Sequence, residues 1–229
     1  IQEWVASLND AELVMVRDPR SADVLTGWGV SRVGVVGDLA MSFPLPPYHS
    51  ESKGIIGINL GCDDAMWGDQ LRVVEEAGKF FFAMSKRGYR FRYISMHPND
   101  TKWMKVLAER GLRDIEYLPW STNESAIAKE LCDIDFLVGQ RLHSVIMAHV
   151  FGKPAISLAY NTKGLDYFDL LPTDHRAFCI RTDELTTERL LDLSKELPRF
   201  PIESLSRAIA TYKKLQTECA DFILKRLNF

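Results

Sequence analysis

A regular alternation of short apolar runs with amphipathic stretches, which begins after residue 54, most constrains how this chain can fold. Each apolar run is continuous, whereas a strand with one solvated face alternates apolar and polar residues. Continuously apolar strands separated by helices are typical of βαβ units, whose crossovers are right-handed. We therefore predict an α/β fold, a Rossmann-like parallel sheet with helices on both faces. The expected strands are Ile55–Leu60, Phe91–Met96, Ile115–Leu118, Phe136–Val138, Ala155–Leu158 and Phe178–Ile180, and the expected helices include Gln70–Lys86, Thr101–Arg110, Glu124–Leu131 and Ile202–Leu227.

The chain before residue 54 has a different character. Residues 1–43 contain two short apolar runs, Leu13–Val16 and Gly34–Val36, with a helical stretch between them. Such a segment is too small to bury a hydrophobic core of its own. Residues 44–53 hold three prolines followed by polar residues, a composition typical of a linker. We predict that residues 1–43 are the remnant of an N-terminal Rossmann-like domain, residues 44–53 a linker, and residues 54–229 a C-terminal Rossmann-like domain.

Charge and composition exclude several classes of function. With 28 Lys and Arg against 31 Asp and Glu, the net charge of −3 provides no global field for nucleic acid or an anionic membrane. No apolar stretch is long enough to span a bilayer. The four cysteines are scattered and form no C-x-x-C pair, so we predict no metal site and expect reduced thiols in a cytoplasmic protein. The absence of G-x-G-x-x-G and P-loop lysine motifs leaves NAD and ATP sites unsupported.

The segment Gly139–Ser144 is the sharpest candidate for a site. It follows the expected strand Phe136–Val138 and turns into a helix, and ligands of parallel sheets bind beyond the carboxyl ends of strands. Arg141 and His143 enter at the first helical turn, where unpaired N–H groups and the helix dipole favour an anion. Residues two apart on a regular helix point in nearly opposite directions, so both can face one ligand only if Arg141 precedes the helix proper. The alternative is that Arg141 pairs with a surface carboxylate and that His143 is an ordinary polar residue.

Three further places follow from position along the predicted sheet. His97 ends a strand and precedes a proline, which suits either a cleft residue or a structural one. Tyr160–Lys163 follows another strand and brings a phenol and an amine to the same edge of the sheet. His149 falls on the apolar face of the helix after Ser144, which favours a core histidine.

Several of these stretches together resemble the signature of the polysaccharide pyruvyl transferase family. The resemblance runs from about Leu13 to Lys163 and is most specific at Arg-Leu-His-Ser in its strand-to-helix context. Two earlier stretches resemble the family's RD…S and GD-x-A motifs, although Leu39 stands where the latter often carries proline. The segments that carry the resemblance are Val16–Ser21, Val36–Ala40, Val138–Ser144, Gly152–Pro154 and Tyr160–Lys163.

The resemblance implies a transferase with two Rossmann-like, GT-B-like domains, of which residues 54–229 would be the donor-binding one. Such an enzyme moves the pyruvyl group of phosphoenolpyruvate onto a sugar of a polysaccharide or its precursor as a cyclic ketal. Its partners would be this donor and a saccharide acceptor, and it would need no further cofactor. Whether it forms a homo-oligomer, and whether residues 1–229 alone are active, stay open. The resemblance makes His143 the catalytic acid/base and gives substrate-binding roles to Arg141, Leu142, Arg17, Lys163, Tyr160 and His97.

Two other functions fit the same residues. A glycosyltransferase-like enzyme with a nucleotide-sugar donor could use the same fold. It would want a carboxylate for the ribose hydroxyls after Lys163, where only Asp166 and Asp169 offer one. A non-catalytic sugar- or phosphate-binding domain could keep Arg141 for affinity, but the ionisable His143 beside it argues against that function.

Overall fold

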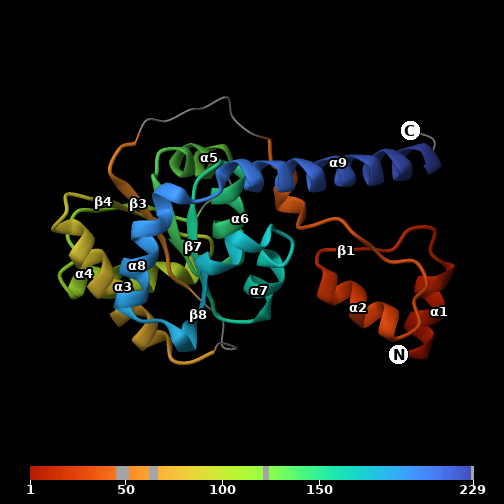
Figure 1. The fold of residues 1–229 in the computed structure, drawn as a ribbon, viewed down its shortest axis with the longest axis horizontal. Coiled ribbons are helices and arrows are strands. Elements are labelled where there is room, and N and C mark those ends of the chain that lie inside the picture. The colour runs from red at the N-terminus through yellow and green to blue at the C-terminus, as the bar shows by residue number, and fades with distance from the viewer. Residues whose placement is uncertain (45–51, 62–66, 121–123, 228–229) are drawn as a thin grey trace.

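A six-stranded sheet forms the main body of the chain. The computed structural model describes residues 1–44, 52–61, 67–120 and 124–227. The strands lie in the order β5-β4-β3-β6-β7-β8, and every neighbouring pair is parallel, which confirms the predicted Rossmann-like sheet (Figure 1). The strands are β3 (Ile55–Asn59), β4 (Arg90–Ile94), β5 (Ile115–Leu118), β6 (Phe136–Gly139), β7 (Ala155–Ala159) and β8 (Cys179–Arg181).

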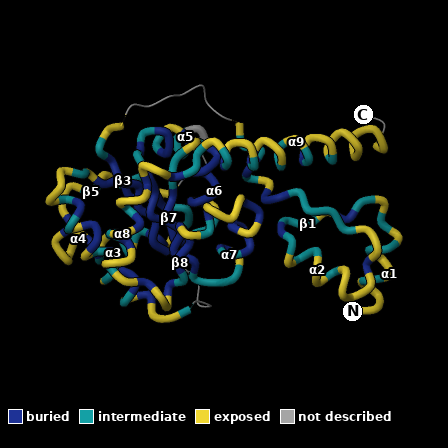
Figure 2. Tube along the Cα trace, viewed as in Figure 1, coloured by how far each residue is buried: buried dark blue, intermediate teal, exposed yellow. Residues whose placement is uncertain are grey.

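Helices cover both faces of this sheet, as the continuously apolar strands predict. Every residue of β3, β6 and β7 is buried, which requires a covered surface above and below the strands (Figure 2). One group of helices contains α3 (Gln70–Ser85), α4 (Thr101–Glu109) and α8 (Thr187–Glu196), of which α4 and α8 each pack against α3. A second group contains α5 (Glu124–Cys132), α6 (Leu142–Val150), α7 (Thr162–Phe168) and α9 (Ile202–Arg226). No helix of the described residues is both long and apolar enough to cross a membrane.

The N-terminal elements form a second, two-stranded parallel sheet. Here α1 (Gln2–Asp10), β1 (Met15–Val16), α2 (Pro19–Gly27) and β2 (Gly34–Val35) follow one another, and neither helix has a buried residue. Helix α2 starts at Pro19 because Asp18 caps it, its carboxylate accepting the Ser21 N–H at 2.8 Å. The division into remnant, linker and domain stays a prediction, and residues 45–51 of the predicted linker lie outside the described residues.

Helix α9 joins the two sheets. It runs from the main body alongside the N-terminal elements (Figure 1), and Arg226 near its end lies 3.1 Å from Glu12. Midway along α9, the buried Gln216 donates from Nε2 to the carbonyls of Val36 and Asp38 at 2.8 and 2.9 Å. The segment between β2 and the short 3₁₀ helix η1 (Leu39–Ser42) is therefore held by a side chain from the opposite end of the chain.

His149 belongs to the core, as the helical spacing predicts. It is 1% exposed, and its Nδ1 lies 2.8 Å from the hydroxyl of Tyr167, whose ring stacks on the imidazole. Its Nε2 has no hydrogen-bond partner among the described residues. Burial, with a smaller contribution from the neighbouring His175, lowers the pKa of His149 to about 3. His149 is therefore neutral at physiological pH.

We expect His149 to make the fold sensitive to acid. Unfolding returns the imidazole to an ordinary pKa of about 6.5, so below that pH the unfolded chain binds a proton that the folded chain does not. Stability should fall by up to about 1.4 kcal/mol per pH unit from pH 6.5 towards pH 3. Urea unfolding at several pH values should show that His149→Phe removes this dependence. Tyr167→Phe, which loses the same hydrogen bond but keeps the imidazole, should retain it; parallel curves for wild type and His149→Phe would contradict the assignment.

Candidate functional site

Arg141 and His143 lie where the sequence predicts, at the junction of β6 and α6. Arg141 is the residue before the first turn of α6 and has an extended backbone (φ −74°, ψ 131°), so it precedes the helix proper. Ser144 donates both its N–H and its hydroxyl to the Arg141 carbonyl, at 3.0 and 2.6 Å, which fixes this turn. The two side chains nevertheless have different partners: Arg141 pairs with Asp100, and His143 faces Asp38.

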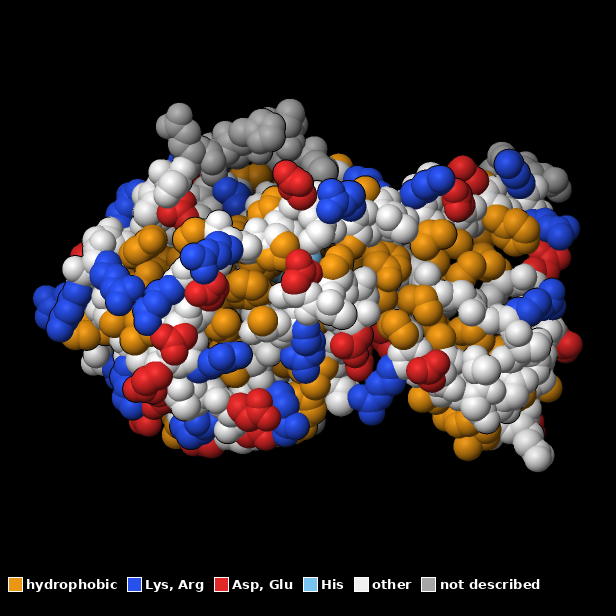
Figure 3. Space-filling model, viewed as in Figure 1, with side chains coloured by type: hydrophobic (Ala, Val, Ile, Leu, Met, Phe, Trp, Pro, Cys, Tyr) orange, Lys and Arg blue, Asp and Glu red, His pale blue; other side chains and the backbone are white. Residues whose placement is uncertain are grey.

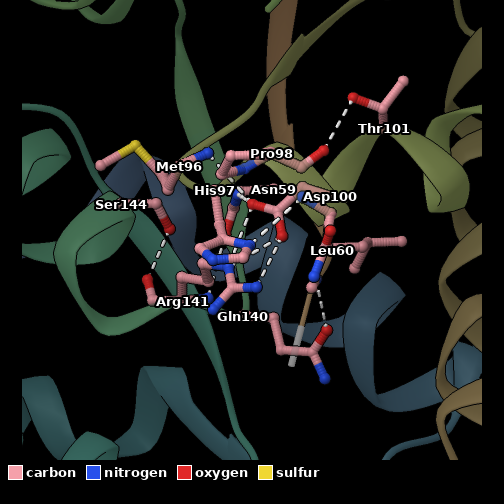
Figure 4. A network of polar contacts seen from close by, with 12 residues as sticks. Asn59, Leu60, Met96, His97, Pro98, Asp100, Thr101, Gln140, Arg141 and Ser144 are labelled. Carbon is pink, nitrogen blue, oxygen red and sulfur yellow. Dashed lines mark hydrogen bonds and ion pairs between the residues drawn. The ribbon is translucent and has the colours of Figure 1, made fainter. Parts of the chain in front are cut away.

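The Arg141 side chain is locked to a carboxylate in the interior. Its Nε lies 2.8 and 3.0 Å from the two carboxyl oxygens of Asp100, and its Nη2 lies 2.8 Å from one of them (Figure 4). Asp100 is fully buried and also accepts the Met96 N–H at 3.0 Å and an Asn59 amide hydrogen at 3.3 Å. A Cβ added at Gly61 would collide with this carboxylate, so only glycine fits there. The partner of Arg141 is therefore a buried carboxylate rather than a surface one.

Amide side chains fasten the surrounding strand ends. The side-chain oxygen of Asn59 accepts the Arg141 N–H at 2.9 Å, and the backbone carbonyl of Asn59 accepts the Gln140 N–H at 2.8 Å. Gln140 accepts the Gly61 N–H at 2.8 Å and exchanges two hydrogen bonds with Gln70 of α3, at 2.7 and 3.0 Å. The carboxyl ends of β3 and β6 and the start of α3 thus form one satisfied polar network, which holds Arg141 rigidly.

His143 projects into a different space. Its side chain is 63% exposed, and its Nε2 lies 3.8 Å from Oδ2 of Asp38. Arg17, at the end of β1, approaches the same oxygen with Nη1 at 3.9 Å. These three residues line a cavity of about 710 Å³ between the N-terminal elements and α9. Figure 3 shows hydrophobic side chains gathered in this region, and the apolar wall includes Leu13, Met15, Val16, Val36, Leu39 and Ile223.

The other residues with predicted substrate-binding roles do not line this cavity. His97 is the residue before the 3₁₀ helix η2 (Pro98–Asp100), and its Nδ1 accepts the Asn99 N–H at 3.2 Å. Leu142 is half-buried and packs against the core. Lys163 lies exposed in the first turn of α7, and the carbonyl of Tyr160 accepts the Trp67 N–H at 2.8 Å. The structure therefore brings Arg17 and His143 together and leaves Arg141, Leu142, His97, Tyr160 and Lys163 outside this cavity.

A second group of charges connects α2 and α7. Asp166, one of the two carboxylates that a nucleotide-sugar donor could use, is 8% exposed and lies 3.7 Å from Arg20. Burial, with a smaller contribution from nearby Asp18, raises the pKa of Asp166. Asp166 therefore pairs with an arginine of the N-terminal elements, while Asp169 is exposed. Nowhere in the described part of the chain do three His, Cys, Asp or Glu residues gather in a way that could hold a metal ion.

Sequence reasoning missed the two carboxylates that orient the candidate residues. Asp100 lies in the stretch after an expected strand, and Asp38 lies in the stretch that resembles the GD-x-A motif. Both were visible as positions, but their pairing with Arg141 and His143 joins segments 41 and 105 residues apart. A signal that could have found them is the rule that a buried arginine or aspartate needs an opposite charge.

Comparison with known families identifies the class of the protein. The fold is a Rossmann-like α/β sheet with an anion-compatible helix terminus at one edge. The family model for polysaccharide pyruvyl transferase matches residues 1–162. The chain belongs to the polysaccharide pyruvyl transferase family, which confirms the resemblance seen in the sequence. A search of curated proteins found no match.

Solved structures of similar fold are GT-B glycosyltransferases and epimerases. UDP-GlcNAc 2-epimerase from Neisseria meningitidis, bound to UDP-GlcNAc, matches with a TM-score of 0.59 and 13% identity, over 92% of this chain and 61% of that one. MnaA from S. aureus, with UDP, matches with a TM-score of 0.59 and 14% identity, over 95% of this chain and 60% of that one. S. aureus TarM matches with a TM-score of 0.56 and 15% identity, over 99% of this chain and 45% of that one. At these identities the likeness shows the fold alone. The chain spans 45–61% of the length of these structures.

Proposed function

We propose that the protein transfers the pyruvyl group of phosphoenolpyruvate to a saccharide as a cyclic ketal. The observation that supports this proposal best is the convergence of Arg17 and His143 on one cavity, in a chain of the polysaccharide pyruvyl transferase family. An arginine offers a planar fork for a carboxylate or phosphate, and an imidazole can move a proton near neutral pH. A small anionic donor that must be protonated needs both.

The reaction requires one proton to be delivered and two to be removed. The methylene carbon of phosphoenolpyruvate takes a proton from His143, and a sugar hydroxyl attacks the adjacent carbon. Phosphate leaves with the electrons of its C–O bond, and a second hydroxyl closes the ring. The two hydroxyls lose their protons: one restores the proton on His143, and the other is taken up by the departing phosphate. General acid–base catalysis of this kind contributes typically about 10²–10⁴-fold to a rate.

The surroundings of His143 suit an anionic donor. His143 is the second residue of α6, a nine-residue helix, where backbone N–H groups and the helix dipole favour negative charge. Arg17 lines the same cavity and can pair with a carboxylate or phosphate. Substrate-binding roles stay predictions for Arg141, Leu142, Lys163, Tyr160 and His97. The proposal also includes a cytoplasmic location and the use of no cofactor.

The choice of donor tests the proposal directly. Calorimetric titration should give a dissociation constant for phosphoenolpyruvate at least about tenfold lower than those for UDP-GlcNAc and a GDP-sugar, a difference of about 1.4 kcal/mol. Incubation with phosphoenolpyruvate and a saccharide should release phosphate and give the ketal methyl signal in the NMR spectrum. Tighter binding of the nucleotide sugar would replace the proposal with a glycosyltransferase-like function. Binding of phosphoenolpyruvate without phosphate release would instead indicate a binding domain.

A further inference from the structure

We infer that Asp38 is a positioning residue for His143, fixing which ring nitrogen of the imidazole faces the reacting donor. The inference rests on the proposed function, in which His143 moves a proton. Asp38 lies in the turn between β2 and η1, and its side chain is 9% exposed. Its partner His143 comes from α6 of the main sheet, so the pair joins the two parts of the chain.

The two carboxyl oxygens of Asp38 have different tasks. Oδ1 accepts the Ala40 N–H at 3.0 Å and caps η1, whereas Oδ2 faces His143 Nε2 at 3.8 Å and Arg17 Nη1 at 3.9 Å. A cap needs only one oxygen, and that oxygen is Oδ1. The second oxygen therefore serves the charged groups of the cavity, and capping does not explain it.

The backbone of Asp38 is held from a third direction. Gln216 of α9 donates to the Asp38 carbonyl at 2.9 Å, and Ser42 in turn donates to the Gln216 amide oxygen. Gly37, at φ +76°, turns the chain in a conformation that favours glycine, and an added Cβ would crowd Tyr212 of α9. A carboxylate whose backbone and first oxygen are both fixed presents its second oxygen in a constant direction, which is the requirement for orienting a ring that is itself exposed.

The orientation has a chemical consequence for His143. At 3.8 Å the carboxylate acts on Nε2 through charge rather than through a hydrogen bond, since the donor and acceptor of an N–H···O hydrogen bond are about 2.7–3.2 Å apart. It favours the ring orientation that points Nε2–H towards Asp38, which leaves Nδ1 on the opposite side to deliver the proton. After transfer, the neutral ring keeps its hydrogen on Nε2, the tautomer that the carboxylate favours.

A charge-only substitution tests the inference. Asp38→Asn keeps the shape, the capping oxygen and the carbonyl that Gln216 holds, but removes the charge. We expect kcat for pyruvyl transfer to fall by about 10- to 100-fold, with a change in KM for phosphoenolpyruvate of no more than about threefold. In a His143→Ala background, Asp38→Asn should lower kcat no further, because the two residues act as one unit. Equal losses in both backgrounds would overturn the inference.

A second measurement does not depend on catalysis. The imidazole ¹⁵N spectrum of the wild-type protein without substrate should show neutral His143 as the Nε2–H tautomer, and Asp38→Asn should give a mixture of tautomers. Asp38→Glu, which restores a carboxylate, should recover most of the wild-type pattern. If the wild type shows this pattern but transfers no pyruvyl group, the proposed function fails while the Asp38–His143 coupling stands. Unchanged spectra in Asp38→Asn would overturn the coupling itself.

Discussion

Arg141→Ala is expected to lower the free energy of unfolding by about 3–5 kcal/mol, the typical cost of removing one partner of a buried ion pair. The substitution leaves Asp100, which is fully buried, without the guanidinium that contacts both of its oxygens at 2.8–3.0 Å. The Asn59 amide and the Met96 N–H still contact the Asp100 carboxylate, but neither carries charge. Urea or thermal unfolding of the two proteins measures the difference.

A surface pair provides the matched control. Arg199 lies 3.4 Å from Glu196, and 82% and 54% of the two side chains are exposed, so Arg199→Ala should cost no more than about 1 kcal/mol. The double variant Arg141→Gln, Asp100→Asn should lose much less stability than the two single variants together, because it removes both charges at once. Equal stability of Arg141→Ala and wild type would show that the pair contributes little to the fold.

The same variant decides what Arg141 does for the ligand. Sequence reasoning assigns it to an anionic group of phosphoenolpyruvate, so its loss should raise the dissociation constant by about ten- to a hundredfold. The ion pair with Asp100 offers a second role, that of fixing the turn from which His143 projects. If the folded fraction of Arg141→Ala binds phosphoenolpyruvate as tightly as wild type, Arg141 is a structural residue of the site.

The fold was predictable to the extent that it depends on local pattern. Apolar runs indicated buried strands, which holds for β3, β6 and β7 but not for the edge strand β5, none of whose residues is buried. The helical stretches between the runs indicated parallel crossovers, as the structure shows. The order of the strands was not predictable, because periodicity does not say which strand lies beside β3. Helices α7 and α8 were not expected as elements. Asn161 caps α7 by accepting the Lys163 N–H at 3.0 Å, and Thr186 caps α8 by accepting that of Arg189 at 3.2 Å, which are signals that sequence reasoning could have used.

The candidate site was predictable in place but not in direction. The rule that strand carboxyl ends share one edge led to the stretches that contain Asp100 and Arg141, and these do meet. It could not say that Arg141 is bound inward while His143 projects outward, because side-chain direction depends on partners distant in sequence. Asp38 and Asp100 are such partners: Asp38 precedes η1, which packs against α6, and Asp100 ends η2.

His143→Ala is expected to lower kcat for pyruvyl transfer by about 10²–10⁴-fold and to change KM for phosphoenolpyruvate much less. The imidazole is the proposed proton donor to the methylene carbon, so its loss affects the chemical step more than the binding of a donor already held by charge. Because 63% of the side chain is exposed, the free energy of unfolding should change by no more than about 0.5 kcal/mol. Initial rates and unfolding curves of the same preparation measure both quantities. A stable His143→Ala variant with wild-type kcat would remove His143 from the mechanism. A variant that loses rate and stability together would give His143 a structural role, since an exposed proton donor can be deleted without cost to the fold.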